Sequence, residues 1–144
     1  PVPPLPGRPA PFNEVTAAVA CQAADAAGAV AVCCFTLSGT TARLLSHFRP
    51  RAPIIAFSPD QQIRRRLALF WGVVPRVLDP VKNSDEMVEL VAEQLVSAGL
   101  AKSGDRIVVV HGSPLGVPGQ TNAIRLHQIG SRPDGSHARY RVPV

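Results

Sequence analysis

Short apolar runs alternate along this chain with segments in which hydrophobic residues recur every three or four positions. The runs are typical of buried strands, and the longer period is typical of amphipathic helices. We expect helices at residues 13–27, 41–48, 59–71 and 84–98, and strands at residues 29–35, 53–57, 73–78, 106–110 and 123–129. This alternation predicts an α/β fold, in which helices cover both faces of a mostly parallel sheet. The last strand follows its neighbour without a helix between them, so we expect it to run antiparallel at an edge.

Residues that favour helix ends set the boundaries of the predicted helices. Asn13 is expected to cap the first helix, and Ser58, which a proline follows, is expected to cap the third. Asn83 or Ser84 is expected to cap the fourth. Pro75 lies inside the third expected strand, and proline cannot donate a ladder hydrogen bond, so this strand should lie at an edge of the sheet.

The turn after the first expected strand is rich in hydroxyl groups. The amides and the dipole at a helix start both attract anions, and glycine lets the backbone approach a ligand closely. We therefore interpret this segment, the hydroxyl turn, as a pocket for one phosphate group. Its residues are Thr36, Leu37, Ser38, Gly39, Thr40 and Thr41. The residues alone also allow an ordinary turn, in which Ser38 or Thr40 only caps the following helix.

The sequence limits the kind of phosphate that such a turn can hold. A nucleoside triphosphate loop needs a lysine in the pattern G-x-x-x-x-G-K-[ST], and this chain has no lysine before Lys82. The dinucleotide pattern G-x-G-x-x-G is absent as well. Hydroxyl and amide groups without a lysine suit a sugar phosphate or a monophosphate, held without a metal ion.

A second loop, residues 111–122, is rich in glycine and follows the fourth expected strand. In α/β sheets ligands bind beyond the carboxyl ends of the strands, where both loops lie, and this favours a binding site over an ordinary turn. His111 is a candidate general base without an orienting acid, and His127 has no partner that the sequence identifies. The chain has no H-x-x-x-H pair, carboxylate cluster or G-x-S-x-G elbow. We therefore expect binding rather than catalysis.

Composition narrows the classes of protein to which the chain can belong. With 144 residues, of which 46% are hydrophobic, it is long enough for one globular domain. The formal charge of +5 suits acidic small molecules or nucleic acid, but aromatic residues are few. Arg64, Arg65 and Arg66 are consecutive on an expected helix and must point in three directions, so we do not expect a nucleic-acid partner.

Apolar runs, cysteines and prolines indicate the compartment and the domain boundaries. No apolar run is long enough to span a membrane, and we see no signal peptide pattern, so we expect a cytoplasmic protein without a membrane partner. Cys33 and Cys34 are adjacent on a strand and point to opposite faces, which favours a core role over a metal site. We expect a proline-rich arm at residues 1–12, one domain at residues 13–130 and a polar tail at residues 131–144.

Several spaced motifs resemble, in order, the C-terminal domain of pyruvate kinases. The longest runs from Thr36 to Pro59, TLSGTTARLLSHFRPRAPIIAFSP. The segments LFWGVVP (69–75), SGD (103–105) and G-x-x-G-x-T-N (116–122) follow at fitting distances. The resemblance covers residues 13–130, nearly all of the expected domain.

This resemblance implies a three-layer α/β/α sandwich with a mixed, mostly parallel five-stranded sheet, which acts as an allosteric effector domain. The hydroxyl turn would cradle one phosphate, and a loop containing Gly112, Ser113, Gly116 and Gly119 would close over the ligand. The active site of such an enzyme lies in other domains. We therefore expect no catalytic residue and no cofactor in this chain, and Mg²⁺ and K⁺ would belong to the catalytic domains.

The partners implied are the catalytic domains of a pyruvate kinase, a phosphorylated small-molecule effector and further copies of the chain. Copies would pair through residues 122–129, whose alternation places Ile124 and Leu126 on one face and Arg125 and His127 on a wet face. Two functions stay open: the regulatory domain of a pyruvate kinase, or a free-standing phospholigand-binding module or sensor. A small enzyme of its own is a third interpretation.

The expected effector is a phosphorylated sugar or a nucleoside monophosphate. The resemblance implies that a second phosphate would meet residues 82–90, where Asp85, Glu86 and Met87 offer no cation. Lys82 precedes this helix, and Arg64–Arg66 could reach across. We expect a monophosphate to bind at least tenfold tighter than fructose 1,6-bisphosphate, a difference of about 1.4 kcal/mol.

Overall fold

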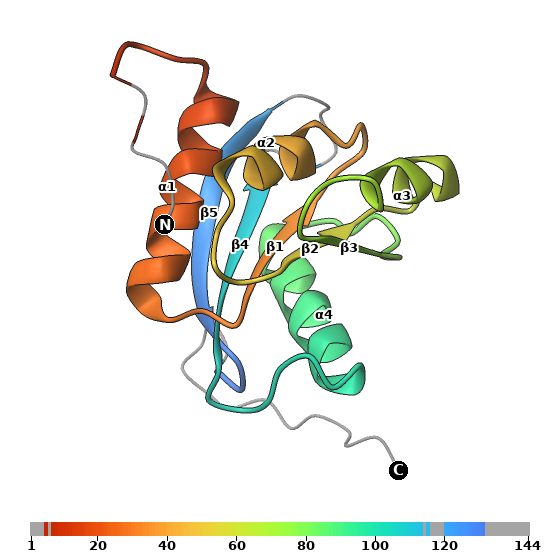
Figure 1. Ribbon diagram of the computed structural model, residues 1–144. Coiled ribbons are helices and arrows are strands. Elements are labelled where there is room, and N and C mark those ends of the chain that lie inside the picture. Colours follow the sequence, from red (N-terminus) through yellow and green to blue (C-terminus); the bar gives the residue numbers. More distant parts are fainter. Residues whose placement is uncertain (1–4, 6, 114, 116–119, 132–144) are drawn as a thin grey trace.

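A five-stranded sheet with helices on both faces forms the centre of the molecule (Figure 1). The computed structural model describes residues 5, 7–113, 115 and 120–131. The helices are α1 (Phe12–Ala27), α2 (Thr40–Phe48), α3 (Gln61–Leu67) and α4 (Ser84–Ser97). The strands are β1 (Ala31–Phe35), β2 (Ile54–Phe57), β3 (Val73–Arg76), β4 (Arg106–Gly112) and β5 (Thr121–Gln128). The predicted α/β class and the element order are confirmed.

The strands lie in the order β3-β2-β1-β4-β5. The first four are parallel to their neighbours, and β5 runs antiparallel to β4, as its helix-free connection predicted. β3 lies at one edge of the sheet, as Pro75 predicted. Proline has no N–H group, and an edge strand has no second neighbour that would need one. β1 lies in the middle, between β2 and β4, so the hydroxyl turn leaves the centre of the sheet.

Alternate residues of the central strand enter two separate hydrophobic cores. Val32 and Cys34 pack with α1, α2 and α3 on one face, whereas Ala31 and Cys33 pack with α4 on the other. Burial of both faces explains why the strand is a continuous apolar run instead of an alternating one. Burial also raises the pKa of Cys34 to about 12, so its thiol stays protonated, as the predicted core role requires.

Two of the predicted helix caps were wrong. Asp60, not Ser58, caps α3: its carboxylate accepts from the N–H groups of Gln62 at 2.8 Å and Ile63 at 3.2 Å. The carboxylate of Asp60 is charged and accepts from two N–H groups at once, so it is a stronger cap than the hydroxyl of Ser58. α1 begins at Phe12 without a side-chain cap, and Asn13 accepts only from the adjacent N–H of Glu14. Asn83 does cap α4, by accepting from the N–H of Glu86 at 2.8 Å.

The two faces of β5 differ from the predicted pattern. Ile124 packs against the core formed with α1, and Leu126 on the same face is 63% exposed. His127 was expected on a wet face, but it is buried, because α4 covers that side of the sheet. Ile129, just beyond the strand, joins the core under α4. In the part of the chain that the structure describes, no helix is long and apolar enough to cross a membrane.

Candidate phosphate-binding site

The hydroxyl turn is held in shape by its own first residue. The N–H of Thr36 donates to the carbonyl of Phe57 at 2.9 Å, which extends the pairing of β1 with β2. The hydroxyl of Thr36 then accepts from the N–H of Gly39 at 2.8 Å and closes the turn. Gly39 has a φ of 89°, a left-handed conformation that residues with a Cβ adopt only under strain. The shape of the turn is therefore held by hydrogen bonds within the chain.

The start of α2 lacks a side-chain cap. Gly39 occupies the capping position and has no side chain, and the hydroxyl of Ser38 accepts only a long bond, of 3.4 Å, from the N–H of Thr40. Among the described residues, the N–H groups of Thr41 and Ala42 have no acceptor. Ser38 donates to the hydroxyl of Thr40 at 3.1 Å, so the two hydroxyls lie together at the surface. Uncapped amides beside paired hydroxyls are the donors that an anion at a helix start uses.

The structure brings the hydroxyl turn and the second loop together. The hydroxyl oxygens of Thr41 and Thr121 lie 2.6 Å apart, and both residues are buried. Asn122 and Ser113 exchange two hydrogen bonds, of 2.7 and 3.0 Å, which draw the ends of the loop close. A Cβ at Gly112 would lie 2.4 Å from the carbonyl oxygen of Gln120, so only glycine fits there. Gly116 and Gly119, the other predicted loop residues, lie outside the described residues.

Two cavities flank the hydroxyl turn. One, of about 160 Å³ between α2 and α3, is lined by Ser38, Gly39, Thr40, Arg43, Ile63, Arg66, Leu67 and Phe70. The other, of about 220 Å³, is largely apolar and is lined by Phe35, Leu37, Pro80, Val81, Met87 and Leu115. The predicted residues are thus divided: Ser38, Gly39 and Thr40 face the basic cavity and Leu37 faces the apolar one. Thr36 and Thr41 use their hydroxyls in internal hydrogen bonds.

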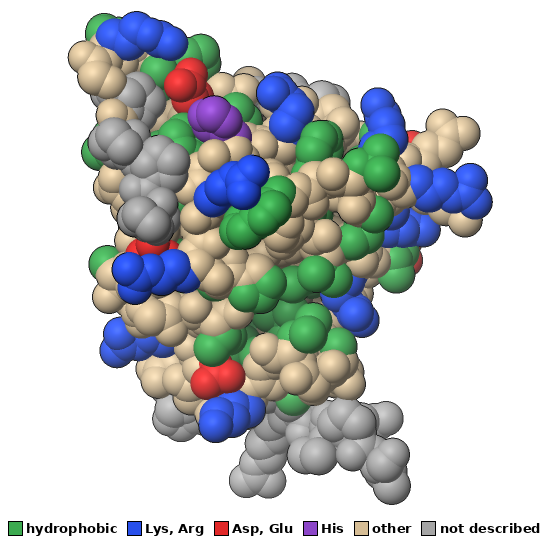
Figure 2. Space-filling model, viewed as in Figure 1, with side chains coloured by type: hydrophobic (Ala, Val, Ile, Leu, Met, Phe, Trp, Pro, Cys, Tyr) green, Lys and Arg blue, Asp and Glu red, His purple; other side chains and the backbone are tan. Residues whose placement is uncertain are grey.

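Arg43 is a binding candidate that the sequence did not suggest, whereas Arg66 was expected only as one of three arginines that could reach a second phosphate. Basic side chains gather over α3 in Figure 2. Arg43 follows the hydroxyl turn by two residues, but the known phosphate-loop pattern has a lysine and not an arginine. The approach of Arg66 depends on how α3 packs against α2, which no local pattern predicts.

Neither of the predicted histidines has the surroundings of a catalytic base. Nδ1 of His111 lies 3.0 Å from the carbonyl oxygen of Gly112, and within the described residues no carboxylate orients the ring. Burial lowers the pKa of His127, and the charge of Arg125 lowers it further. Its Nε2 has no hydrogen-bond partner in the described part of the chain. The same residues contain no group of three or more His, Cys, Asp or Glu that could hold a metal ion.

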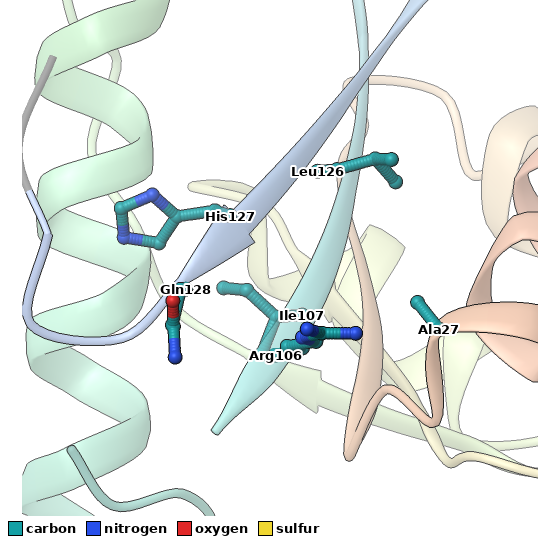
Figure 3. A pocket seen from close by; sticks show the side chains of 6 residues that line it. All are labelled: Ala27, Arg106, Ile107, Leu126, His127 and Gln128. Carbon is teal, nitrogen blue, oxygen red and sulfur yellow. The ribbon is translucent and has the colours of Figure 1, made fainter. Parts of the chain in front are cut away.

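A further cavity, of about 220 Å³, lies at the opposite end of β5 from the hydroxyl turn. It is lined by Ala27, Arg106, Ile107, Leu126, His127 and Gln128. Figure 3 shows Leu126 and Ala27 on the side of α1, whereas His127 points toward α4. The polar groups therefore do not converge on one point, as a small-molecule site requires.

Comparison with known proteins gives one consistent result. Residues 14–127 match the family described as "Pyruvate kinase, alpha/beta domain". A pyruvate kinase of Agrobacterium vitis is 42% identical over 116 residues, covering 78% of this chain and 24% of that protein. A pyruvate kinase of Clostridium acetobutylicum is 35% identical over 117 residues, covering 81% of this chain and 25% of the relative.

A solved structure gives the same fold. The crystal structure of a pyruvate kinase from Cryptosporidium parvum superposes with a TM-score of 0.75 at 27% identity, over 84% of this chain and 23% of that one. The chain thus spans about a quarter of the length of the relatives it matches. Sequence and fold agree, and the chain belongs to the pyruvate kinase family, as its C-terminal α/β domain.

Proposed function

We propose that this chain is the regulatory domain of a pyruvate kinase, which binds a phosphorylated sugar or a nucleoside monophosphate at the hydroxyl turn. The observation that carries the proposal is the uncapped start of α2, whose free amides lie beside the hydroxyls of Ser38 and Thr40. Hydrogen bonds to a charged group contribute roughly 1.5–3 kcal/mol each, so a few of them suffice for micromolar affinity.

The link between Thr41 and Thr121 supports a regulatory role. It joins the first turn of α2 to the start of β5, at the end of the second loop. A ligand at the hydroxyl turn would therefore bind beside Thr41, whose hydroxyl is bonded directly to the edge strand. We propose that β5 carries subunit contacts, because its outer edge pairs with no strand among the described residues. Ligand binding would then influence the assembly through β5.

The chemistry of the enzyme is proposed to lie outside this chain. The relatives are named pyruvate kinases, and the chain covers about a quarter of each. The described residues offer neither a metal-binding cluster nor an oriented general base. We propose that phosphoryl transfer belongs to the remaining three quarters of such an enzyme, and that the catalytic domains are the partners of this one.

Calorimetry with adenosine 5′-monophosphate and fructose 6-phosphate tests the proposal, with adenosine and fructose as controls that lack the phosphate. We expect saturable binding of at least one phosphorylated ligand and none of its control. The double variant Ser38→Ala/Thr40→Ala should weaken binding more than tenfold, and the exposed Ser97→Ala should leave it unchanged. Equal affinity of the folded double variant would refute the assignment.

A coupled assay with phosphoenolpyruvate, ADP, Mg²⁺ and K⁺ tests whether the chain is catalytic by itself. We expect no turnover. Activity that scales with the amount of purified protein, and that survives a control for contaminating kinase, would overturn this part of the proposal.

A further inference from the structure

The basic cavity between α2 and α3 contains two arginines that the fold itself does not use. Among the described residues, the guanidinium groups of Arg43 and Arg66 have no hydrogen bond and no acidic partner within 4 Å. Two nearby arginines do have partners within the domain. Arg64 donates to the carbonyl of Ser58 at 2.8 Å, and Arg49 lies over the ring of Trp71 at 4.8 Å. Arg43 and Arg66 are the basic residues that line the cavity beside the hydroxyl turn, and neither has a partner among the described residues.

Arg43 is exposed, and it adds a positive charge near the positive end of a helix. It lies in the first turn of α2, where the helix dipole is positive, and that turn contains no acidic residue to offset it. Arg66, from the last turn of α3, brings a second positive charge to the same cavity. Both arginine side chains are exposed, so solvent weakens the repulsion between them, and an anion in the cavity would be attracted by both charges and by the helix end.

The cavity has the size and lining for one phosphate group. Its volume of about 160 Å³ corresponds to roughly five water molecules at the volume each occupies in the liquid. Ile63, Leu67 and Phe70 form one apolar side of the cavity. Ser38, Gly39 and Thr40 form the opposite side. Guanidinium groups bind phosphate oxygens in a bidentate manner, and two of them balance a dianion.

We infer that Arg43 and Arg66 bind the phosphate of the effector, together with the hydroxyls of Ser38 and Thr40. The inference rests on the proposed function. It adds two positively charged side chains to a turn whose own residues, 36–41, carry no charge. It also places the phosphate on the α2–α3 side of the hydroxyl turn, and leaves the apolar cavity beside Leu37 for the part of the ligand without charge.

The variants Arg43→Gln and Arg66→Gln test the inference, with Arg65→Gln as the matched control. Arg65 is exposed on the same helix and does not line the cavity, so its substitution changes the net charge alone. Affinity for adenosine 5′-monophosphate, measured by calorimetry at one ionic strength, should fall about tenfold for each single variant and about a hundredfold for the pair. Arg65→Gln should change it less than twofold.

Thermal unfolding provides a second readout that does not depend on a nucleoside. Inorganic phosphate should raise the unfolding midpoint of the wild type and of Arg65→Gln, but not that of the Arg43→Gln/Arg66→Gln pair. In the absence of phosphate, the pair should be at least as stable as the wild type, because the repulsion is gone. Wild-type affinity in both arginine variants, with a loss in Ser38→Ala/Thr40→Ala, would overturn the inference and leave the proposed function intact. A wild type that binds no phosphorylated probe would overturn both.

Discussion

The hydroxyl oxygens of Thr41 and Thr121 lie 2.6 Å apart, although 80 positions separate the two residues in the chain. One belongs to the first turn of α2 and the other begins β5, so this hydrogen bond joins the centre of the sheet to its edge. Both side chains are buried, and neither hydroxyl can turn to water if its partner is lost. The bond therefore contributes to stability as well as to the proposed communication between the turn and the edge strand.

Replacing either threonine by valine should destabilise the domain. Thr41→Val or Thr121→Val keeps the shape of the side chain and leaves one buried hydroxyl without a partner, which costs about 1–3 kcal/mol of unfolding free energy. The double variant removes both hydroxyls, so it should be more stable than the sum of the single effects predicts. Urea denaturation of all four proteins gives this coupling energy. Additive effects would show that the two hydroxyls do not interact in solution.

Gly39 offers a way to place a charge inside the basic cavity. A Cβ there would meet Leu67 at 3.6 Å and Ile63 at 3.9 Å, which are ordinary contacts, so the cost comes from the positive φ. Gly39→Asn is the matched control, because asparagine tolerates this conformation better than other residues with a Cβ. Gly39→Asp has the same shape and adds a carboxylate. At 4 Å, two unit charges repel by about 4 kcal/mol at an effective dielectric constant of 20.

We expect Gly39→Asp to bind adenosine 5′-monophosphate at least tenfold more weakly than Gly39→Asn. Without ligand, the aspartate variant should unfold at a higher temperature than the asparagine variant, since its carboxylate neutralises the cavity. Calorimetry measures the affinities of Gly39→Asp and Gly39→Asn, and thermal unfolding measures their stabilities. Equal affinities would mean that the phosphate does not approach Gly39.

The parts of the fold that the sequence predicted depend on local spacing. The continuous apolar run that contains Ala31, Val32, Cys33 and Cys34 was enough to predict a strand that is buried on both faces. The missed features depend on contacts between distant segments. The approach of Arg66 to the hydroxyl turn follows from the packing of α3 beside α2, and neither helix specifies that packing alone. The burial of His127 likewise follows from α4, which lies far from it in the chain.

The outer edge of β5 should mediate self-association. Leu126 is 63% exposed on this edge strand, and in the described structure β5 pairs only with β4. Leu126→Lys should shift the protein toward monomer, because a charged lysine opposes pairing between edges. Leu69→Lys is the matched control, since Leu69 is 84% exposed near α3, at the other side of the sheet. Sedimentation over a range of concentrations measures the effect. A wild type that stays monomeric at high concentration would contradict the assignment.

His127 should make stability depend on pH. Burial lowers its pKa from the ordinary value of 6.5, the charge of Arg125 lowers it further, and Glu89 on α4 opposes both. The unfolded chain therefore binds this proton more tightly than the folded domain. The contribution of neutral His127 to stability is complete above pH 6.5 and is lost as the pH falls below that value. His127→Gln should flatten this dependence in urea denaturation between pH 5 and pH 8. An unchanged slope would assign the dependence to other groups.

The surroundings of the apolar cavity predict that the domain prefers a ligand with one phosphate. Leu37, Pro80, Val81 and Met87 line this cavity without a basic side chain. At the start of α4, Asp85 pairs with Arg125, so that guanidinium already has a partner, and Glu86 adds a further negative charge. A second dianion in this cavity would lose its hydration, and none of the lining residues offers a cation, which opposes binding.

Fructose 6-phosphate and fructose 1,6-bisphosphate form the matched pair for this prediction, because they differ only in the second phosphate. We expect the monophosphate, or adenosine 5′-monophosphate, to bind at least tenfold tighter than the bisphosphate, a difference of about 1.4 kcal/mol. Titrations at one ionic strength measure it, and Glu86→Gln should narrow the gap by removing one repulsive charge. If the bisphosphate binds more tightly in the wild type, a cation must reach its second phosphate. The effector would then span both cavities, and the variants Arg43→Gln and Arg66→Gln would show which phosphate these two arginines hold.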